Sequence, residues 1–333
     1  MSMRFGLFTT LALVLLLPVV ASAQSLGGAV GNTNPFTISI DPQYPTPQGT
    51  ATLSFLSSTL DLANASMTVS VGGTQTYKGS VQPVAITLGR AGKVLSVLVK
   101  ITSGGVPYSQ SVVLQPEDVS LIAEPFASAP VLYPGKPLIP LGGTTRVVAI
   151  ANFKDAAGRT LDPATLSYSW TVDGTQIANS SGIGKEVIMV ASPLQYRERS
   201  VSVVVESLSA SFVGGASLTL APVEPSVRLY QNDPLLGILF DHALGGTYAI
   251  QGTESSLYAA PFSLPLLNGA PFLQWFLNGG AAQTGSLITL RPTGNGQGSA
   301  SLSLTASAGA LSEAMANLSL SFGATSSTNL FGL

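Results

Sequence analysis

The segment YSWTVDG, Tyr168 to Gly174, decides the fold of this chain. Large apolar side chains alternate with Ser and Thr along it, which is the period-two pattern of a β-strand with one buried face. The strand ends in Asp-Gly, a dipeptide that favours a type I′ hairpin turn because both central positions need a positive φ. We therefore expect Trp170 to be the central core aromatic of a β-sandwich, while Ser169 faces solvent.

Two further strands repeat this pattern, MTVSVGG at Met67 to Gly73 and LQWFLNGG at Leu273 to Gly280. The turn glycines of the three strands are 101 and 105 residues apart. Trp275 takes the core position in the last strand. Self-similarity at a fixed period indicates tandem domains.

Two more landmarks follow the same period. The tetrapeptide LGGT occurs at 141–144 and again at 244–247, each time before an alternating strand, and Gly49-Thr50 has the matching place in the first unit. Each unit also closes with a pair of alternating strands, at 94–116, 200–222 and 299–322. Units of about a hundred residues built from short alternating strands are typical of β-sandwiches.

We therefore predict an all-β chain of three tandem β-sandwich domains behind an N-terminal signal peptide. No amphipathic helix is expected after the signal peptide. The predicted segments are a signal peptide at 1–23, an N-terminal segment at 24–35, domains at 36–116, 117–223 and 224–323, and a C-terminal tail at 324–333.

The N-terminus has the features of an export signal. Arg4 supplies a positive charge, Phe5 to Leu17 is apolar, and Ala21-Ser22-Ala23 has the small-x-small form of a cleavage site. The alternative is an uncleaved membrane anchor, although the apolar stretch is shorter than the roughly 20 residues of a spanning helix. We expect cleavage before Gln24 and an extracellular, cell-surface or periplasmic location.

The motif Tyr168-x-Trp170-x-x-Asp173-Gly174, echoed as Trp275-x-x-Asn278-Gly279, resembles the bacterial immunoglobulin-like and polycystic-kidney-disease-type (PKD) repeats of surface proteins. The chain departs from PKD repeats because their acidic WDFGDG core is missing. The resemblance implies immunoglobulin-like domains that act as spacers and as adhesion or protein-contact modules without catalytic residues. The layout also looks like exported bacterial proteins of pilus-type surface systems.

Composition excludes several classes of function. Charged residues make up 9% of the chain, the net charge is −2, and there is no basic run, so nucleic acid is not an expected partner. The chain contains no Cys, which excludes disulfides, thiolate metal sites and Cys nucleophiles. Each domain must therefore be stabilised by its hydrophobic core alone.

Catalytic and metal-binding signals are weak. His242 is the one histidine of the chain, and it stands beside Asp241. No G-x-S-x-G turn accompanies it, so we predict that His242 occupies a turn or edge position and is not catalytic. We also expect no cofactor. Calcium at the domain junctions would need clustered oxygen ligands, and the D-x-D-x-D-G spacing is absent. We expect solvated charges at the junctional acids Glu117, Asp118, Glu124, Glu206, Glu224 and Asp233.

The third unit carries the one candidate binding surface. With Trp275 inward, alternation points Phe272 and Phe276 outward, where the other units have Ser and Thr. An apolar connection from Tyr258 to Pro271 precedes them, and either this connection covers the two rings or another molecule does. The predicted surface comprises Tyr258, Phe262, Leu266, Phe272 and Phe276.

Two classes of function remain open. The first is a non-catalytic surface scaffold or adhesion protein with a protein partner at the cell envelope. The second is a carbohydrate-binding or hydrolytic accessory module, which needs a cleft lined with aromatic rings and paired acids. Aromatic residues are 7% of the chain, and alternation places most of them in cores, which favours the first class.

Overall fold

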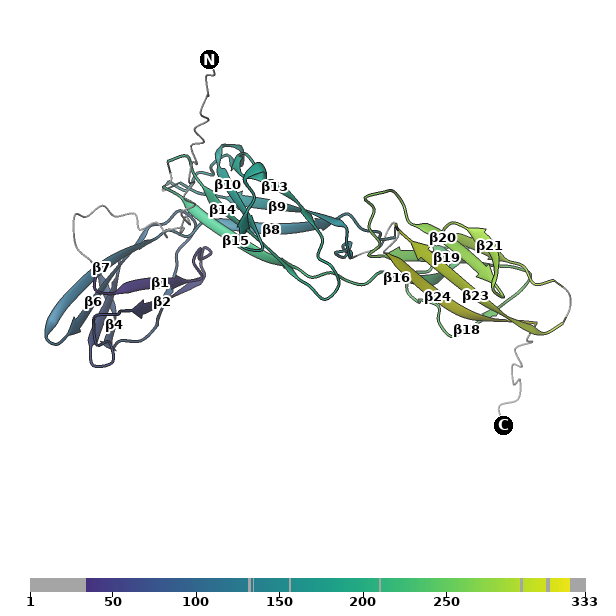
Figure 1. Cartoon of the computed structure of the whole chain (residues 1–333), viewed down its shortest axis with the longest axis horizontal. Coiled ribbons are helices and arrows are strands. Elements are labelled where there is room, and N and C mark those ends of the chain that lie inside the picture. The colour runs from purple at the N-terminus through teal and green to yellow at the C-terminus, as the bar shows by residue number, and fades with distance from the viewer. Residues whose placement is uncertain are drawn as a thin grey trace, which may run out of the picture.

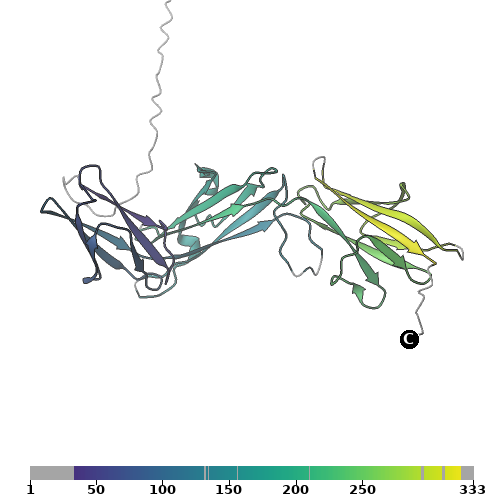
Figure 2. The ribbon, with the colours of Figure 1, turned by 90° about the horizontal axis from the view of Figure 1, so that it is seen from below.

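The computed structural model describes residues 34–323 except 131, 132, 134, 156, 210, 294, 295, 310 and 311. The chain forms three β-sandwiches in a row (Figure 1), and the view from below shows the same order (Figure 2). The predicted fold class, tandem β-sandwiches of the immunoglobulin-like type, is confirmed. Helical structure within the described residues is limited to two 3₁₀ turns, η1 (Pro163–Thr165) and η2 (Ala178–Ser180). None of the described segments is a helix long and apolar enough to cross a membrane.

The first domain packs a three-stranded sheet against a four-stranded one. The first sheet has the order β1 (Thr37–Asp41), β2 (Thr50–Leu56), β5 (Val84–Thr87). The second has the order β4 (Thr74–Ser80), β3 (Ser66–Val71), β6 (Leu95–Ser103), β7 (Val106–Leu114). Neighbouring strands are antiparallel, and the residues of each strand alternate between the core and solvent.

The second domain repeats this arrangement. Its three-stranded sheet has the order β13 (Val187–Ala191), β9 (Thr144–Asn152), β8 (Asp118–Pro125). Its other sheet has the order β11 (Thr175–Gln176), β10 (Ser167–Val172), β14 (Arg199–Glu206), β15 (Val213–Leu220), and β12 (Gly182–Ile183) also pairs with β10.

The third domain adds strands to the same plan. One sheet has the order β17 (Gly237–Ile238), β16 (Ser226–Asp233), β19 (Ser255–Phe262), β22 (Leu287–Leu290). The other has the order β18 (Thr247–Ile250), β24 (Glu313–Phe322), β23 (Gly298–Ser307), β20 (Phe272–Leu277), β21 (Gly280–Thr284). The pairing of β18 with β24 is parallel, whereas the other ladders of this domain are antiparallel.

Each domain has its own hydrophobic core. Trp170 and Trp275 are completely buried at the centres of the second and third cores. Their indole Nε1 atoms donate hydrogen bonds of 2.8 Å to the carbonyl oxygens of Lys185 and Gly285, respectively. A buried indole N–H needs such a partner, and the two domains supply it from corresponding places.

The turns after the central strands are also built alike. Asp173 and Asn278 have left-handed φ angles of 49° and 48°, as a type I′ turn requires. The Oδ1 atom of each side chain accepts a hydrogen bond of 2.9 Å from a backbone amide of the neighbouring strand, that of Ser200 and Ser301 respectively. The short polar side chain thus tolerates the left-handed backbone and ties the turn to the sheet.

The LGGT landmark is not equivalent in the two domains where it occurs. In the second domain it leads into β9, which pairs with β8 and β13. In the third domain it leads into β18, which joins the opposite sheet by pairing with β24. The structural counterpart of β9 is β19, because both strands occupy the middle of the smaller sheet. The LGGT sequence therefore predicts a turn, but it does not predict which sheet the following strand joins.

Candidate protein-contact cleft

The predicted connection before Phe272 is partly a strand. Tyr258 and Phe262 belong to β19, in the sheet opposite to the one that holds Phe272 and Phe276. The interpretation of Tyr258 to Pro271 as one irregular connection is therefore wrong. The strand holds Tyr258 between Leu257 and Ala259, and both of these neighbours are completely buried in the core.

Tyr258 lies on the outer face of its sheet in an aromatic cluster. It is paired across the strands with Tyr230, and the ring of Phe240 packs edge to face against both, with ring centroids 6.1 and 5.1 Å away. Burial raises the pKa of the Tyr258 hydroxyl. The loop that carries Phe240 thus covers this part of the sheet.

Phe262 and Leu266 lie at the joint between the second and third domains. Residues 126–128, which follow β8, run beside residues 263–266, which follow β19. Backbone hydrogen bonds of 3.1 and 3.0 Å run from Ser263 N to Ser128 O and from Leu266 N to Phe126 O. Phe262 packs edge to face against Tyr133, with the ring centroids 5.1 Å apart. The joint is therefore an added piece of antiparallel pairing, not a flexible linker.

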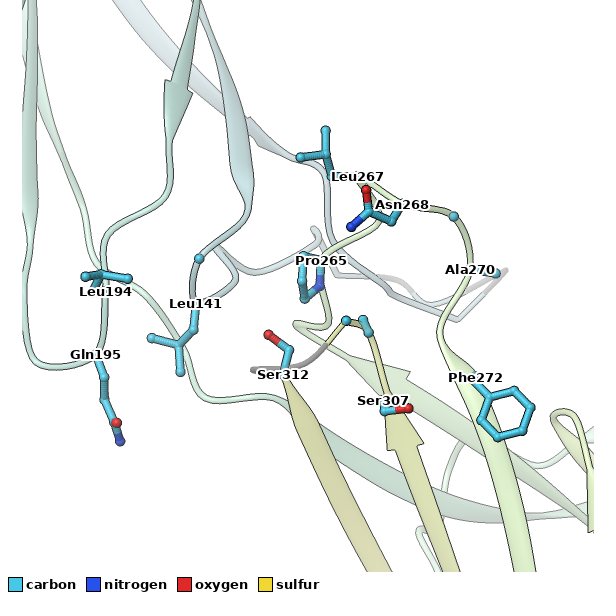
Figure 3. A pocket seen from close by; sticks show the side chains of 14 residues that line it. Leu141, Leu194, Gln195, Pro265, Leu267, Asn268, Ala270, Phe272, Ser307 and Ser312 are labelled. Atoms are coloured by element: carbon cyan, nitrogen blue, oxygen red, sulfur yellow. The ribbon is translucent and has the colours of Figure 1, made fainter.

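A cleft of about 550 Å³ opens at this joint. Figure 3 shows Leu141, Leu194 and Gln195 of the second domain facing Pro265, Ser307 and Ser312 of the third. Phe272 stands at the far end of the lining, and its side chain is 59% exposed. Phe276, four residues further along β20, is half-buried and does not line the cleft.

The cleft combines apolar walls with neutral polar groups. Its apolar side chains are Leu141, Leu194, Pro265, Leu267, Ala270, Phe272 and Ala308. Its hydrogen-bonding side chains are Gln195, Asn268, Ser307 and Ser312. None of the described residues that line it is charged. Such a surface suits a neutral ligand or an apolar side chain of another protein, and it offers no electrostatic attraction to an ion.

The loop that supplies Leu194 also presents an aromatic ring. Tyr196 is 91% exposed, and its backbone has a φ of 58°. A left-handed backbone is uncommon for a bulky residue, and strain of this kind persists only where the surroundings enforce it. Sequence reasoning missed Leu194 and Tyr196, because nothing in the pattern places the 192–198 loop beside the third domain.

The expectation that Glu117 is a solvated charge at the first junction is wrong, because its side chain is buried. Glu117 lies between β7 and β8, it is 3% exposed, and its Oε2 atom accepts a hydrogen bond of 3.1 Å from the Lys154 backbone amide. Its Oε1 atom is buried without a hydrogen-bond partner. Burial raises the pKa of Glu117 to about 7, and the neighbouring Asp118 adds to the rise.

The other residues considered for calcium or catalysis are dispersed. Glu124 pairs with Arg146, and Glu224 accepts a hydrogen bond from Gln195. Within the described part of the chain, no group of three or more acids and histidines comes together as a metal site. His242 lies on an exposed turn between β17 and β18.

No protein-family model and no curated protein matches this chain. Solved structures of tandem domain arrays are similar to it at low identity. Three N-terminal domains of the bacteriophage RB49 highly immunogenic outer capsid protein align with 87% of this chain and 99% of their own, at 14% identity and a TM-score of 0.24. The central fibronectin-III array of RIM-binding protein aligns with 86% and 97%, at 8% identity and a TM-score of 0.30.

A third similar structure comes from Bacteroides ovatus. It is SGBP-B of a mixed-linkage glucan utilisation locus, in complex with a mixed-linkage heptasaccharide. The alignment covers 83% of this chain and 65% of that one, at 11% identity and a TM-score of 0.23. At these identities the likeness concerns the fold alone.

Proposed function

We propose that this chain is an exported, non-catalytic scaffold or adhesion protein whose tandem domains make protein–protein contacts. The observation that carries the proposal is the uncharged cleft at the second joint, which two domains build together. Its partner is a protein at the cell envelope or surface that inserts apolar side chains between Leu194 and Phe272.

The chemistry of the cleft rim supports a protein partner. Protein interfaces are enriched in aromatic and large apolar side chains and depleted of charge at their centres. Leu194 and Leu267 are 64% and 68% exposed within a lining that carries no charge among its described residues. The hydrogen-bonded joint holds both walls in place, so binding loses little conformational entropy.

Export rests on the first 23 residues, which lie outside the described part of the chain. Signal peptidase cleavage after Ala23 yields a chain that begins at Gln24. N-terminal sequencing of the protein from the native cell envelope tests this. A first residue of Met1 or Ser2 means that the segment is kept as an anchor.

Carbohydrate binding is the alternative function. Sugar sites commonly stack a ring on aromatic side chains and hold it with paired polar groups. The cleft has one aromatic side chain, Phe272, and no carboxylate among its described lining residues. Specific binding on a glycan array, lost in Phe272→Ser, would favour the sugar-binding function over the protein contact.

The experiment is photo-crosslinking from the cleft in native envelopes, followed by a binding assay with the partner so identified. The test variant is Leu194→Ser, Phe272→Ser. The matched control is Leu208→Ser, because Leu208 is 72% exposed in the second domain but does not line the cleft. We expect the control to bind like the natural chain and the test variant to lose binding. Equal binding by all three proteins would refute the proposed site.

A further inference from the structure

The outer face of the smaller sheet of the second domain is aliphatic and uncovered. Its middle row runs across three strands through Ile122, Val148 and Val187, which are neighbours in the pairing register. Ile150 and Met189 flank this row on the same face and are 49% and 53% exposed. Val187 is 42% exposed, and Ile122 and Val148 are half-buried. We call these five residues the aliphatic face.

Each of the other two domains also has a row across three strands on the outer face of its smaller sheet. In the first domain the row is Asp41, Thr52 and Ala85. In the third domain it is Tyr230, Tyr258 and Leu287. The first domain thus presents mostly polar side chains to water, as an open sheet face normally does.

The third domain covers two residues of its apolar row with its own chain, whereas Leu287 at the end of the row is 43% exposed. Phe240 packs on Tyr230 and Tyr258, and Tyr230 is only 8% exposed. The second domain has a similarly apolar row, but no described segment covers it, as the exposure of Val187, Ile150 and Met189 records. A contiguous apolar patch of this kind usually marks a contact surface.

The two ends of the aliphatic face carry different charges. At one end Arg146 and Glu124 are paired across the strands and form an exposed ion pair. At the other end Asp118 and Asn152 are paired, and the Asn152 amide donates to the Asp118 carboxylate over 3.4 Å. An apolar centre between polar ends is the usual anatomy of a protein interface.

We propose that the aliphatic face is a self-association surface, on which a second copy of this chain packs about a twofold axis that runs along the strands between β8 and β9. This axis brings Arg146 of each copy opposite Glu124 of the other, and Ile122 opposite Val148. An axis across the strands would instead oppose Glu124 and Asp118, two like charges. Charge complementarity therefore selects one twofold arrangement, in which the two sheets pack with aligned strands.

The small size of the aliphatic face limits the affinity of the dimer. About an axis between β8 and β9, only these two strands of each copy overlap. Two strands about 4.8 Å apart and up to nine residues long, at about 3.3 Å each, cover roughly 300 Å². A stable interface buries about 800 Å² per partner, so this contact falls below the standard size. We therefore expect a weak dimer, with a dissociation constant on the order of tens of micromolar or above.

Analytical ultracentrifugation of the purified chain over this range tests the proposal. We expect a reversible monomer–dimer equilibrium that is lost in Ile122→Glu, Ile150→Glu, because both positions lie on β8 and β9 inside the proposed contact, where burial of two carboxylates would oppose it. The control is Met315→Glu on β24, since Met315 is 62% exposed and lies in the third domain. A monomeric natural chain, or a dimer that survives in the double variant or is lost in the control, would overturn the proposal.

A mixing experiment tests the axis separately. Arg146→Glu gives each copy two acids at this end, and Glu124→Arg gives it two arginines, so each variant alone should be monomeric. An equimolar mixture of the two should form a heterodimer, because every acid then faces an arginine. If the mixture stays monomeric while the natural chain dimerises, the twofold arrangement proposed here is wrong. The protein-contact cleft uses other residues, so either proposal can fail without the other.

Discussion

Ser128 in the second domain and Leu264 in the third are joined by two hydrogen bonds, although 136 residues separate them in the sequence. The Ser128 amide donates to the Leu264 carbonyl oxygen over 2.7 Å, and the Leu264 amide donates to the Ser128 Oγ over 3.0 Å. Both residues are buried. The hydroxyl therefore supplies the partner of an amide that water does not reach.

Ser128→Ala should weaken the joint. The substitution leaves the buried Leu264 amide unpaired, which costs about 1–3 kcal/mol. We expect a lower melting temperature in calorimetry and a broader distribution of molecular dimensions in small-angle X-ray scattering. Ser209→Ala is the control, because its hydroxyl is exposed and hydrogen-bonds to the exposed Ser207 hydroxyl. Unchanged melting of the Ser128 variant would mean that the hydroxyl does not satisfy the amide.

Glu117 should make stability depend on pH at the first junction. Burial raises its pKa from 4.5 to about 7, so between these values the folded chain keeps a proton that the unfolded chain releases. The stabilisation of the folded chain by protonated Glu117 is complete below about pH 4.5 and is lost as the pH rises through 7. The loss is on the order of 3 kcal/mol, since the pKa rises from 4.5 to about 7 and one pKa unit corresponds to about 1.4 kcal/mol.

Glu117→Gln removes this titration and keeps an acceptor for the Lys154 amide. We expect the variant to be more stable than the natural chain at pH 8 and to show a flatter dependence on pH between 5 and 8. Urea denaturation at several pH values measures both effects. The control is Glu124→Gln at an exposed acid, which should leave the pH dependence of stability unchanged. If Glu117→Gln also leaves it unchanged, another group is responsible for the titration.

Trp170→Ala should cost about 3–5 kcal/mol in free energy of unfolding of the second domain, as expected for removal of a buried large aromatic ring. Trp170 is completely buried, whereas Ser169 lies half-buried on the opposite face of β10. Ser169→Ala is therefore the matched control and should change stability by less than about 0.5 kcal/mol. Similar small effects of both changes in chemical denaturation would contradict this assignment of faces.

The fold could be predicted because its determinants are local. Alternation along Tyr168 to Val172 depends on one strand, and the Asp173–Gly174 turn depends on two φ angles that only a few residue types tolerate. Both signals recur in each domain, which identifies the repeat. LGGT misled the alignment of the third domain because a glycine turn is compatible with a strand in either sheet.

The cleft could not be predicted in the same way. Its walls come from the 192–198 loop of one domain and from Pro265 to Phe272 of the next, and their approach depends on the pairing of 126–128 with 263–266. No periodicity within either domain encodes that pairing. Alternation along β20 correctly predicted that Phe272 points outward. It predicted the same for Phe276, but Phe276 is half-buried.

Separate replacement of Phe272 and Phe276 distinguishes the binding surface from the fold of the third domain. Phe272 is 59% exposed and lines the cleft, so Phe272→Ser should change the free energy of unfolding by less than about 0.5 kcal/mol and should weaken partner binding. Phe276 is half-buried outside the cleft lining, so Phe276→Ser should cost about 1–2 kcal/mol, part of the 1.5–3 kcal/mol of a fully buried side chain. Its binding should be unchanged at temperatures where the domain stays folded. Thermal melting and a binding assay on the two variants side by side separate these effects, and binding lost through Phe276→Ser alone would move the contact from the cleft to the open face of β20.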